Sequence, residues 1–231
     1  MTYVIAEAGI NHCGSLDRAM KMIEVAADAG AHAVKFQSFT ANDLGYDAGL
    51  TEMLRRYELS EDDHLKLMVK AEKCNIEFLS TPFDRKWVDF LVDHGVRQIK
   101  ISSGKVKDVA FCQYVQGKGL PVIISNGMCT QSELVAVTTP FTTVLYCVSE
   151  YPTPPWKIDF RKMIWLGATF HQFGFSDHTI GIEASIYAAA MGAHVIEKHF
   201  TMDRRLPGPD QVCSLQPDEL KEMIRGIHNV A

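Results

Sequence analysis

The sequence lacks the features that mark several large classes of protein. No run of lysine and arginine dominates any segment, and the formal net charge of the 231 residues is −5, so the basic surface typical of a nucleic-acid binder is missing. No apolar stretch reaches the roughly 20 residues that span a bilayer. The N-terminal residues enter an apolar segment with no basic region or cleavage site before it. We therefore expect a cytoplasmic protein without nucleic-acid or membrane partners.

Closely spaced cysteines and linker segments are also missing. The six cysteines lie far apart and form no C-x-x-C pair, which argues against a structural zinc site or a small disulfide scaffold. No stretch rich in proline or serine divides the chain. The sequence has 231 residues, of which 47% are hydrophobic, and this length and composition are sufficient to bury one sizeable core. Residues 1–231 are therefore expected to form a single domain.

The sequence does contain a regular alternation of short β-branched or aromatic segments with longer segments whose apolar residues recur every three or four positions. The eight strand candidates are Tyr3–Gly9, Ala33–Phe39, Glu77–Phe83, Gln98–Ser103, Pro121–Gly127, Thr143–Glu150, Phe173–Thr179 and Val195–Thr201. Helices are predicted between them, for example over Leu16–Ala29 and Glu61–Lys73, and a last one over Asp218–Val230. Ser60 and Asp63 form a capping pattern for the second of these. Eight strand–helix units predict an α/β fold, a (β/α)8 TIM barrel.

An open, doubly wound sheet would also alternate strands and helices. Such a sheet usually carries a glycine-rich phosphate loop after its first strand. The segment Gly9–Gly14 does not have that fingerprint. The closed barrel is therefore favoured.

Polar residues stand at the C-terminal end of every predicted strand, where (β/α)8 barrels carry their active sites. They include Glu7, Asn11, His12, Lys35, Gln37, Ser80, Thr81, Lys100, Ser102, Ser103, Ser125, Asn126, Ser149, Glu150, Tyr151, Ser176, Asp177, His178, Glu197, Lys198 and His199. One such residue, Ser80 for example, is as readily explained as a turn or capping residue. Their recurrence at eight strand ends indicates a functional site.

Two lysines fall inside apolar runs, where an unpaired ammonium group is costly. Lys35 and Lys100 are therefore expected to face the barrel interior and to bind a phosphate or carboxylate. Hydroxyl groups on neighbouring strand ends would add neutral donors: Thr81, Ser103, Ser125 and Ser176. The alternative is a buried ion pair with Glu7 or Glu197.

Two histidines end adjacent strands. His178 and His199 follow strands seven and eight, so their imidazoles can converge on a divalent metal ion and leave coordination positions open for substrate. Glu7, on the neighbouring first strand, could complete the site directly or through water. His12 follows the first strand and is as well suited to orienting a loop. The histidines on helices and turns, His64 among them, are expected at the solvated surface.

Taken in order, these segments resemble the sialic acid synthase family, which makes N-acetylneuraminate and related nonulosonates. The matching segments are Ala6–His12, Val34–Gln37, Leu79–Phe83, Lys100–Gly104, Cys147–Pro154, Phe175–Thr179, Glu197–Thr201 and Pro207–Asp210. Together they extend over nearly the whole chain.

The resemblance implies a metal-dependent transferase that condenses phosphoenolpyruvate with a sugar aldehyde. It implies phosphoenolpyruvate binding by Lys35, Thr81, Lys100, Ser103, Ser125 and Ser176. His178 and His199 would bind Mn²⁺, with Mg²⁺ or Co²⁺ as alternatives, and Glu7 would handle protons or orient water near the metal. Tyr151 and Asp210 match the family's sugar-contacting positions.

Three positions near the sugar depart from the family pattern. Lys105 stands where sialate-forming members carry a glutamate, and Cys13 stands where an asparagine is usual. Ser149 replaces an asparagine that some sialate-forming members carry. The acceptor, N-acetylmannosamine or a related hexosamine, therefore stays open. The family's C-terminal antifreeze-like domain, which covers a partner subunit's site, is missing from these residues, so either the chain is cut or the protein works without that lid. The resemblance is compatible with a homodimer. The alternative function is a barrel that binds phosphoenolpyruvate and metal as a non-catalytic or regulatory subunit.

Overall fold

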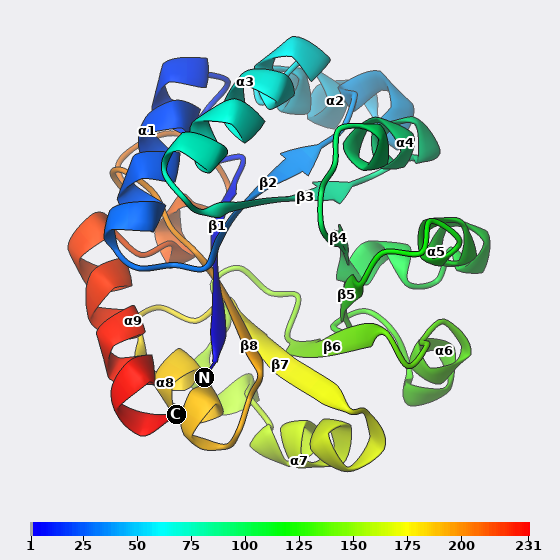
Figure 1. The fold of residues 1–231 in the computed structure, drawn as a ribbon, viewed down its shortest axis with the longest axis vertical. Coiled ribbons are helices and arrows are strands. Elements are labelled where there is room, and N and C mark those ends of the chain that lie inside the picture. Colours follow the sequence, from blue (N-terminus) through cyan, green and yellow to red (C-terminus); the bar gives the residue numbers. More distant parts are fainter. Residues whose placement is uncertain (1) are drawn as a thin grey trace.

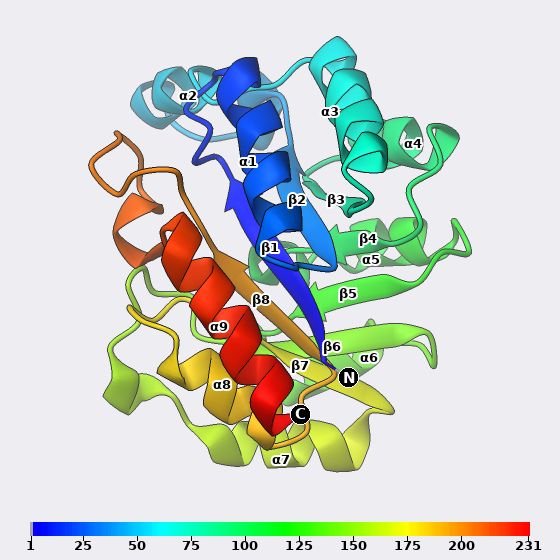
Figure 2. The same ribbon diagram turned by 60° about the vertical axis from the view of Figure 1, so that its left-hand side comes forward.

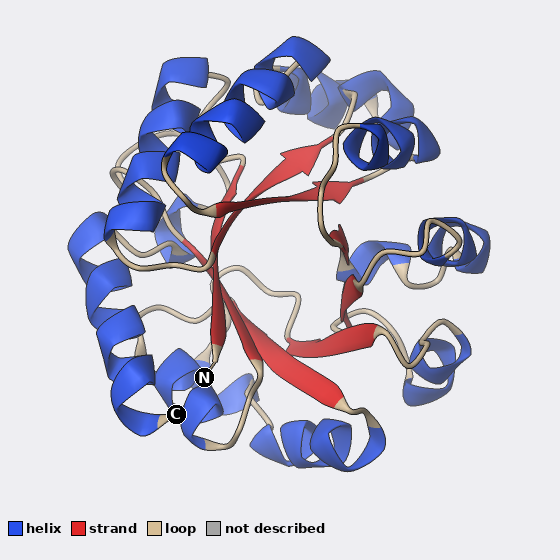
Figure 3. Cartoon of the chain, viewed as in Figure 1, coloured by secondary structure: helices blue, strands red, loops and turns tan. Residues whose placement is uncertain are grey.

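The computed structural model describes residues 2–231 as one ring of parallel strands surrounded by helices (Figures 1 and 3). The strands are β1 Tyr3–Gly9, β2 Ala33–Ser38, β3 Glu77–Pro82, β4 Ile99–Ile101, β5 Val122–Ser125, β6 Thr142–Cys147, β7 Gln172–Asp177 and β8 Val195–His199. The predicted α/β barrel is confirmed. Several strands end earlier than predicted. Strand β4, for instance, ends at Ile101 and not at Ser103, because Ser103–Lys105 forms a 3-10 turn, η2.

The helices lie outside the strand ring. They are α1 Leu16–Asp28, α2 Ala48–Arg55, α3 Glu61–Lys73, α4 Arg85–Asp93, α5 Val109–Gln116, α6 Gln131–Ala136, α7 Phe160–Thr169, α8 Glu183–Ala190 and α9 Pro217–Val230, with shorter 3-10 turns η1 Ala41–Leu44, η3 Pro155–Lys157 and η4 Gln211–Cys213. The predicted capping box of α3 is present, since Ser60 and Asp63 each accept a backbone hydrogen bond from the other. No helix within residues 2–231 is long and apolar enough to cross a bilayer.

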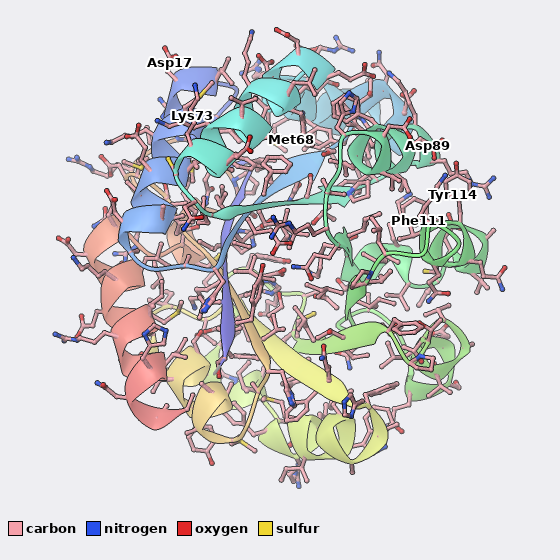
Figure 4. All side chains as sticks on the ribbon, viewed as in Figure 1. Asp17, Met68, Lys73, Asp89, Phe111 and Tyr114 are labelled. Atoms are coloured by element: carbon pink, nitrogen blue, oxygen red, sulfur yellow. The ribbon has the colours of Figure 1, made fainter. Side chains whose placement is uncertain are left out.

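The sheet runs in the order β3-β2-β1-β8-β7-β6-β5-β4, so the ring closes between β3 and β4. Along residues 2–231 these two strands share no backbone ladder, although they are neighbours. Side chains join them at the start of the strands, where the Gln98 Nε2 atom donates to Glu77 Oε1 at 3.0 Å and to Tyr3 Oη at 3.1 Å. Outside the ring, Tyr114 of α5 donates to Asp89 of α4 at 2.7 Å; both are labelled in Figure 4.

The interior of the barrel is layered, because side chains alternate between the two faces of each strand. An apolar layer fills the end where the strands begin, near which both termini lie in Figure 2. It is made by Ile5, Ala33, Leu79, Ile123, Leu145 and Val195. Two residues further along the strands, the inward positions become charged or polar, as Glu7 and Lys35 illustrate. The apolar layer is therefore the floor on which the polar residues stand.

The prediction for His64 is wrong. Its side chain is fully buried between α3 and the sheet, where Nε2 lies 2.8 Å from Ser38 Oγ and Nδ1 lies 2.9 Å from the Ser60 carbonyl oxygen. Ser38 Oγ lies in turn 2.6 Å from Ser80 Oγ. The sequence pattern of the helix did not predict that His64 is buried. A polar ring can be buried only where hydrogen-bond partners are present, and one of its two partners, Ser38, comes from a different element, β2.

Candidate active site

A small cavity opens at the C-terminal ends of the strands, above the apolar floor. Its volume is about 70 Å³, and it is lined by Glu7, Lys35, Gln37, Thr81, Phe83, Lys100, Ser102, Ser103, Ser125, Tyr151, Ser176, His178, Glu197 and His199. All predicted site residues except Lys105 and Asp210 belong to this set. A larger hollow of about 780 Å³ lies at the opposite end of the barrel, near Tyr3 and Arg97, and contains none of them.

Both interior lysines are buried, and each is paired with a glutamate. Lys35 Nζ lies 2.9 Å from Glu7 Oε2 and 3.5 Å from Glu197 Oε2, while Lys100 Nζ lies 2.8 Å from Glu197 Oε1. The contact between Lys35 and Glu7 has the distance of an ion pair but not the angle of a hydrogen bond, so this carboxylate oxygen keeps a free lone pair. The ion-pair interpretation of the lysines is thus observed, and their binding of an anion stays a prediction.

These four groups control one another's ionisation. Burial raises the pKa of Glu7 to about 7, against the opposing effect of the Lys35 ammonium group. Burial also disfavours the Glu197 carboxylate, but the ammonium groups of Lys100 and Lys35 outweigh it and hold the pKa of Glu197 below its usual value. Burial lowers the pKa of Lys100. Near neutral pH, Glu7 can therefore exchange a proton while Glu197 stays ionised.

Two hydroxyl groups complete the hydrogen bonds of this charged cluster. Thr81 Oγ1 accepts a hydrogen bond of 2.9 Å from Lys35 Nζ, and Ser176 Oγ donates one of 2.8 Å to Glu197 Oε1. Each hydroxyl comes from a strand next to the one whose charged group it contacts. They therefore help to hold the lysine and the glutamate at fixed places in the cavity.

Two other predicted hydroxyl groups remain available for a ligand. Ser103 Oγ lies 2.9 Å from Ser149 Oγ, and either atom can be the donor. The hydroxyl of Ser125 is buried and has no hydrogen-bond partner in the described part of the chain. A buried hydroxyl without a partner is rare in native proteins, and the Ser125 hydroxyl has both its hydrogen and its lone pairs free for a ligand.

The two histidines lie close together at the mouth of the cavity, because His178 directly follows β7 and His199 ends the neighbouring strand β8. Their ring centroids are 5.6 Å apart. Burial lowers the pKa of His178, and it lowers that of His199 well below its usual value, with further lowering by His178. Both imidazoles are therefore neutral near pH 7, which is the form that coordinates metal ions.

Each of these rings has a nitrogen atom without a hydrogen-bond partner in the described part of the chain, as a metal ligand requires. His178 Nδ1 lies 2.8 Å from the Val148 carbonyl oxygen and must donate to it, so Nε2 carries the free lone pair. His199 Nδ1 is buried without a partner among residues 2–231. Gly9 has a φ of +50° and allows close packing here, since a Cβ atom would lie 3.2 Å from Glu7 Oε1 and 3.5 Å from His199 Nδ1. Within the same residues no group of three or more His, Cys, Asp or Glu side chains has a metal-binding arrangement.

The predicted sugar-binding residues lie in different places. Tyr151 stands at the rim, with its ring 4.1 Å from that of His178 and 46% of its surface exposed. Asp210 lies just before η4; burial raises its pKa to about 6, and Lys35 opposes the shift. Lys105 does not line the cavity, and its Nζ atom lies 5.5 Å from the Phe111 ring centroid. Only Tyr151 of the three is therefore brought against the other site residues.

The most central residue of the cluster was not among the predicted site residues. Glu197 contacts both lysines and Ser176, yet from the sequence it was given no role beyond that of a polar strand-end residue and a partner for a lysine. The sequence could have identified Glu197 as a site residue, because it stands two positions before His199 and therefore on the same inward face of β8. Gln37 and Ser102 were likewise named only as polar strand-end residues, and Phe83 was given no role; all three also line the cavity.

Comparison with known proteins identifies relatives of this chain. The profile of the NeuB family matches residues 22–231. The N,N'-diacetyllegionaminic acid synthase of Legionella pneumophila is 40% identical, over 98% of this chain and 71% of that protein. The enzyme of the same name from Campylobacter jejuni is 38% identical, over 99% of this chain and 76% of that protein.

A solved structure shows the same fold over the whole chain. The crystal structure of an N-acetylneuraminic acid synthetase from Leptospira borgpetersenii, in complex with citrate, superimposes with a TM-score of 0.95. The sequences are 34% identical, and the match covers 99% of this chain and 83% of that one. This chain is therefore similar to named sugar-acid synthases in both sequence and structure.

Proposed function

Because this chain belongs to the NeuB family, we propose that it condenses phosphoenolpyruvate with a sugar aldehyde to give a nonulosonic, sialic-acid-like acid and phosphate. Residues 1–231 would form its synthase barrel domain. The relatives named above are synthases of such sugar acids. The observation that carries the proposal is that two neutral imidazoles with free nitrogens and two buried lysines share one cavity at the strand ends.

The anionic substrate would lie at the lysine side of the cavity. Phosphoenolpyruvate carries a phosphate and a carboxylate, and its proposed site is lined by Lys35, Thr81, Lys100, Ser103, Ser125 and Ser176. The first five can donate to the anion directly, whereas Ser176 donates its hydroxyl hydrogen to Glu197 and would hold that carboxylate in place. With both glutamates ionised, the two lysines are neutralised. The raised pKa of Glu7 allows this group to take up a proton, which leaves the cluster with a net positive charge for an anion.

The aldehyde would lie at the histidine side. His178 and His199 would hold a divalent ion, Mn²⁺ with Mg²⁺ or Co²⁺ as alternatives, which when bound makes the aldehyde carbon more electrophilic. Tyr151 at the rim lies tilted against the His178 ring and edge-on to the His199 ring, and would orient the sugar. Asp210 and Lys105 would act from the surrounding loops. The acceptor we propose is N-acetylmannosamine or a related hexosamine.

The proton balance of the reaction assigns a role to Glu7. A bond forms between C3 of phosphoenolpyruvate and the aldehyde carbon, water adds at C2, and phosphate leaves with cleavage of its carbon–oxygen bond. The aldehyde oxygen gains a proton and the water loses one. Glu7, whose pKa is about 7, lies beside Lys35 and close to the His199 ring, and can carry this proton at its carboxylate.

Phosphate release provides the test. The protein is incubated with Mn²⁺, phosphoenolpyruvate and a panel of aldoses that includes N-acetylmannosamine, and free phosphate is measured. We expect release that depends on both an aldose and Mn²⁺ and that is abolished in His199→Ala. Aldose-independent release, or a His199→Ala variant with undiminished activity, would refute the proposed reaction.

A further inference from the structure

A second buried ion pair lies behind the two histidines, on the outward faces of β7 and β8. Lys198 Nζ is 2.9 Å from Asp177 Oδ2, and neither side chain has any exposed surface. Both residues lie between the strands and the helix layer, outside the cavity. The reaction proposed above makes no use of them.

The pair sits in register between two rows of cavity residues. Asp177 and Lys198 are direct cross-strand partners, and the partners one step earlier are Ser176 and Glu197. Because side chains alternate along a strand, the residues before and after the pair point into the barrel while the pair itself points outward. His178 directly follows Asp177 in the sequence, and His199 directly follows Lys198. The ion pair therefore links the two backbones directly beneath the imidazoles.

Every polar atom of this pair has a partner. Asp177 Oδ1 accepts from the Thr179 N–H at 2.8 Å and from the Thr179 hydroxyl at 2.7 Å. Asp177 Oδ2 accepts from Ser185 Oγ at 2.7 Å and forms the ion pair with Lys198. Lys198 Nζ also donates to the carbonyl oxygen of Thr179. A fully satisfied network of this kind is rigid.

The network encloses the backbone of His178 on both sides. The turn from Asp177 to Thr179 spans His178, and Lys198 fastens Thr179 to β8 next to His199. The carbonyl oxygen of His178 is itself held by the Thr153 N–H at 2.8 Å. Sliding of the backbone of His178 relative to that of His199 would have to break these bonds.

We infer that Asp177 and Lys198 are positioning residues that hold the His178 and His199 imidazoles at the separation that binds a divalent ion. Stability alone is a weak reason for the pair, because replacing a buried ion pair with apolar groups of similar size is often neutral or stabilising. Groups that hydrogen-bond to metal-binding histidines commonly change metal affinity 10- to 100-fold when they are replaced. Asp177 and Lys198 act on the same histidines through the backbone, so we expect an effect at the lower end of that range. This inference rests on the proposed function, since it requires the histidine pair to bind metal.

The test compares folding with Mn²⁺ affinity in the same variants. Lys198→Met leaves the Asp177 carboxylate buried without its cation and should lower the unfolding temperature strongly. Asp177→Asn combined with Lys198→Met removes both charges and should recover most of that temperature. We expect the double variant nevertheless to bind Mn²⁺ about 10-fold or more weakly in an electron paramagnetic resonance titration. A purely structural role would restore unfolding temperature and Mn²⁺ affinity together.

A matched control uses the buried network behind β2 and β3. Ser38→Ala breaks the hydrogen bonds to His64 and Ser80 but touches neither β7 nor β8, so it should leave the Mn²⁺ dissociation constant within about twofold of wild type. Suppose that the wild type binds Mn²⁺, that His199→Ala does not, and that the double variant binds Mn²⁺ as tightly as the wild type. The positioning role of Asp177 and Lys198 is then overturned, while the proposed function stands. If the wild type binds no Mn²⁺, the metal site of the proposed function fails, and the inference fails with it. Should the double variant not fold, Ser185→Ala, which removes one bond to Asp177 and no charge, must still weaken Mn²⁺ binding more than Ser38→Ala does.

Discussion

Replacing Lys100 with methionine removes one ammonium group from the buried cluster while nearly preserving side-chain volume. Glu197 then loses its 2.8 Å partner and keeps Lys35 at 3.5 Å and the hydroxyl of Ser176. Removing one member of a buried pair typically costs about 3–5 kcal/mol. Because Glu197 retains two partners, we expect the lower end of that range.

The matched control is a surface pair of the same length. Lys86 Nζ lies 2.8 Å from Glu61 Oε1, but these side chains are 71% and 46% exposed. Lys86→Met should cost less than about 1 kcal/mol, because water screens the pair. The two variants thus differ mainly in burial, not in distance.

Thermal unfolding followed by circular dichroism distinguishes the two variants. For a protein of this size each kcal/mol shifts the melting temperature by roughly 2–4 °C, so Lys100→Met should melt roughly 6–12 °C below the wild type. Lys86→Met should stay within roughly 4 °C. Equal melting temperatures for the two variants would show that the lysine in the barrel is not held as a buried ion, and would contradict the electrostatic description of the site.

Three further predictions concern single residues of the site. The raised pKa of Glu7 means that the folded state binds a proton more tightly than the unfolded state, so the contribution of Glu7 to stability is fully present below pH 4.5 and is lost as the pH rises to about 7. Glu7→Gln should therefore flatten this part of the pH dependence of the free energy of unfolding, measured by chemical denaturation. An unchanged pH dependence would contradict the raised pKa. Gly9→Ala should lower Mn²⁺ affinity, measured by calorimetry, because its Cβ atom would crowd Glu7 and His199 and its φ of +50° disfavours alanine; wild-type affinity would argue that the site has room to adjust. Lys105→Glu should raise the rate of phosphate release with N-acetylmannosamine relative to other aldoses, whereas an unaltered aldose profile would remove Lys105 from the acceptor site.

Much of the site could be predicted because of the way a parallel barrel is built. Residues far apart in the sequence, such as Lys35 and His199, were assigned to one place only because both stand at C-terminal strand ends, and those ends meet at one mouth of the barrel. The acceptor side was less predictable, because Lys105 and Asp210 stand on loops whose paths no periodic pattern defines.

The sequence by itself determined the eight strand–helix units, the capping of α3 and the polar residues at the strand ends, since these depend on local spacing and on the twofold alternation of side chains. Only the tertiary structure decided which charges meet. It placed Glu197 between Lys35 and Lys100, and it buried the Asp177–Lys198 pair behind the histidines. The reason is physical: periodicity tells which face a side chain occupies, whereas the partner of a buried charge is selected by the elements that pack around it.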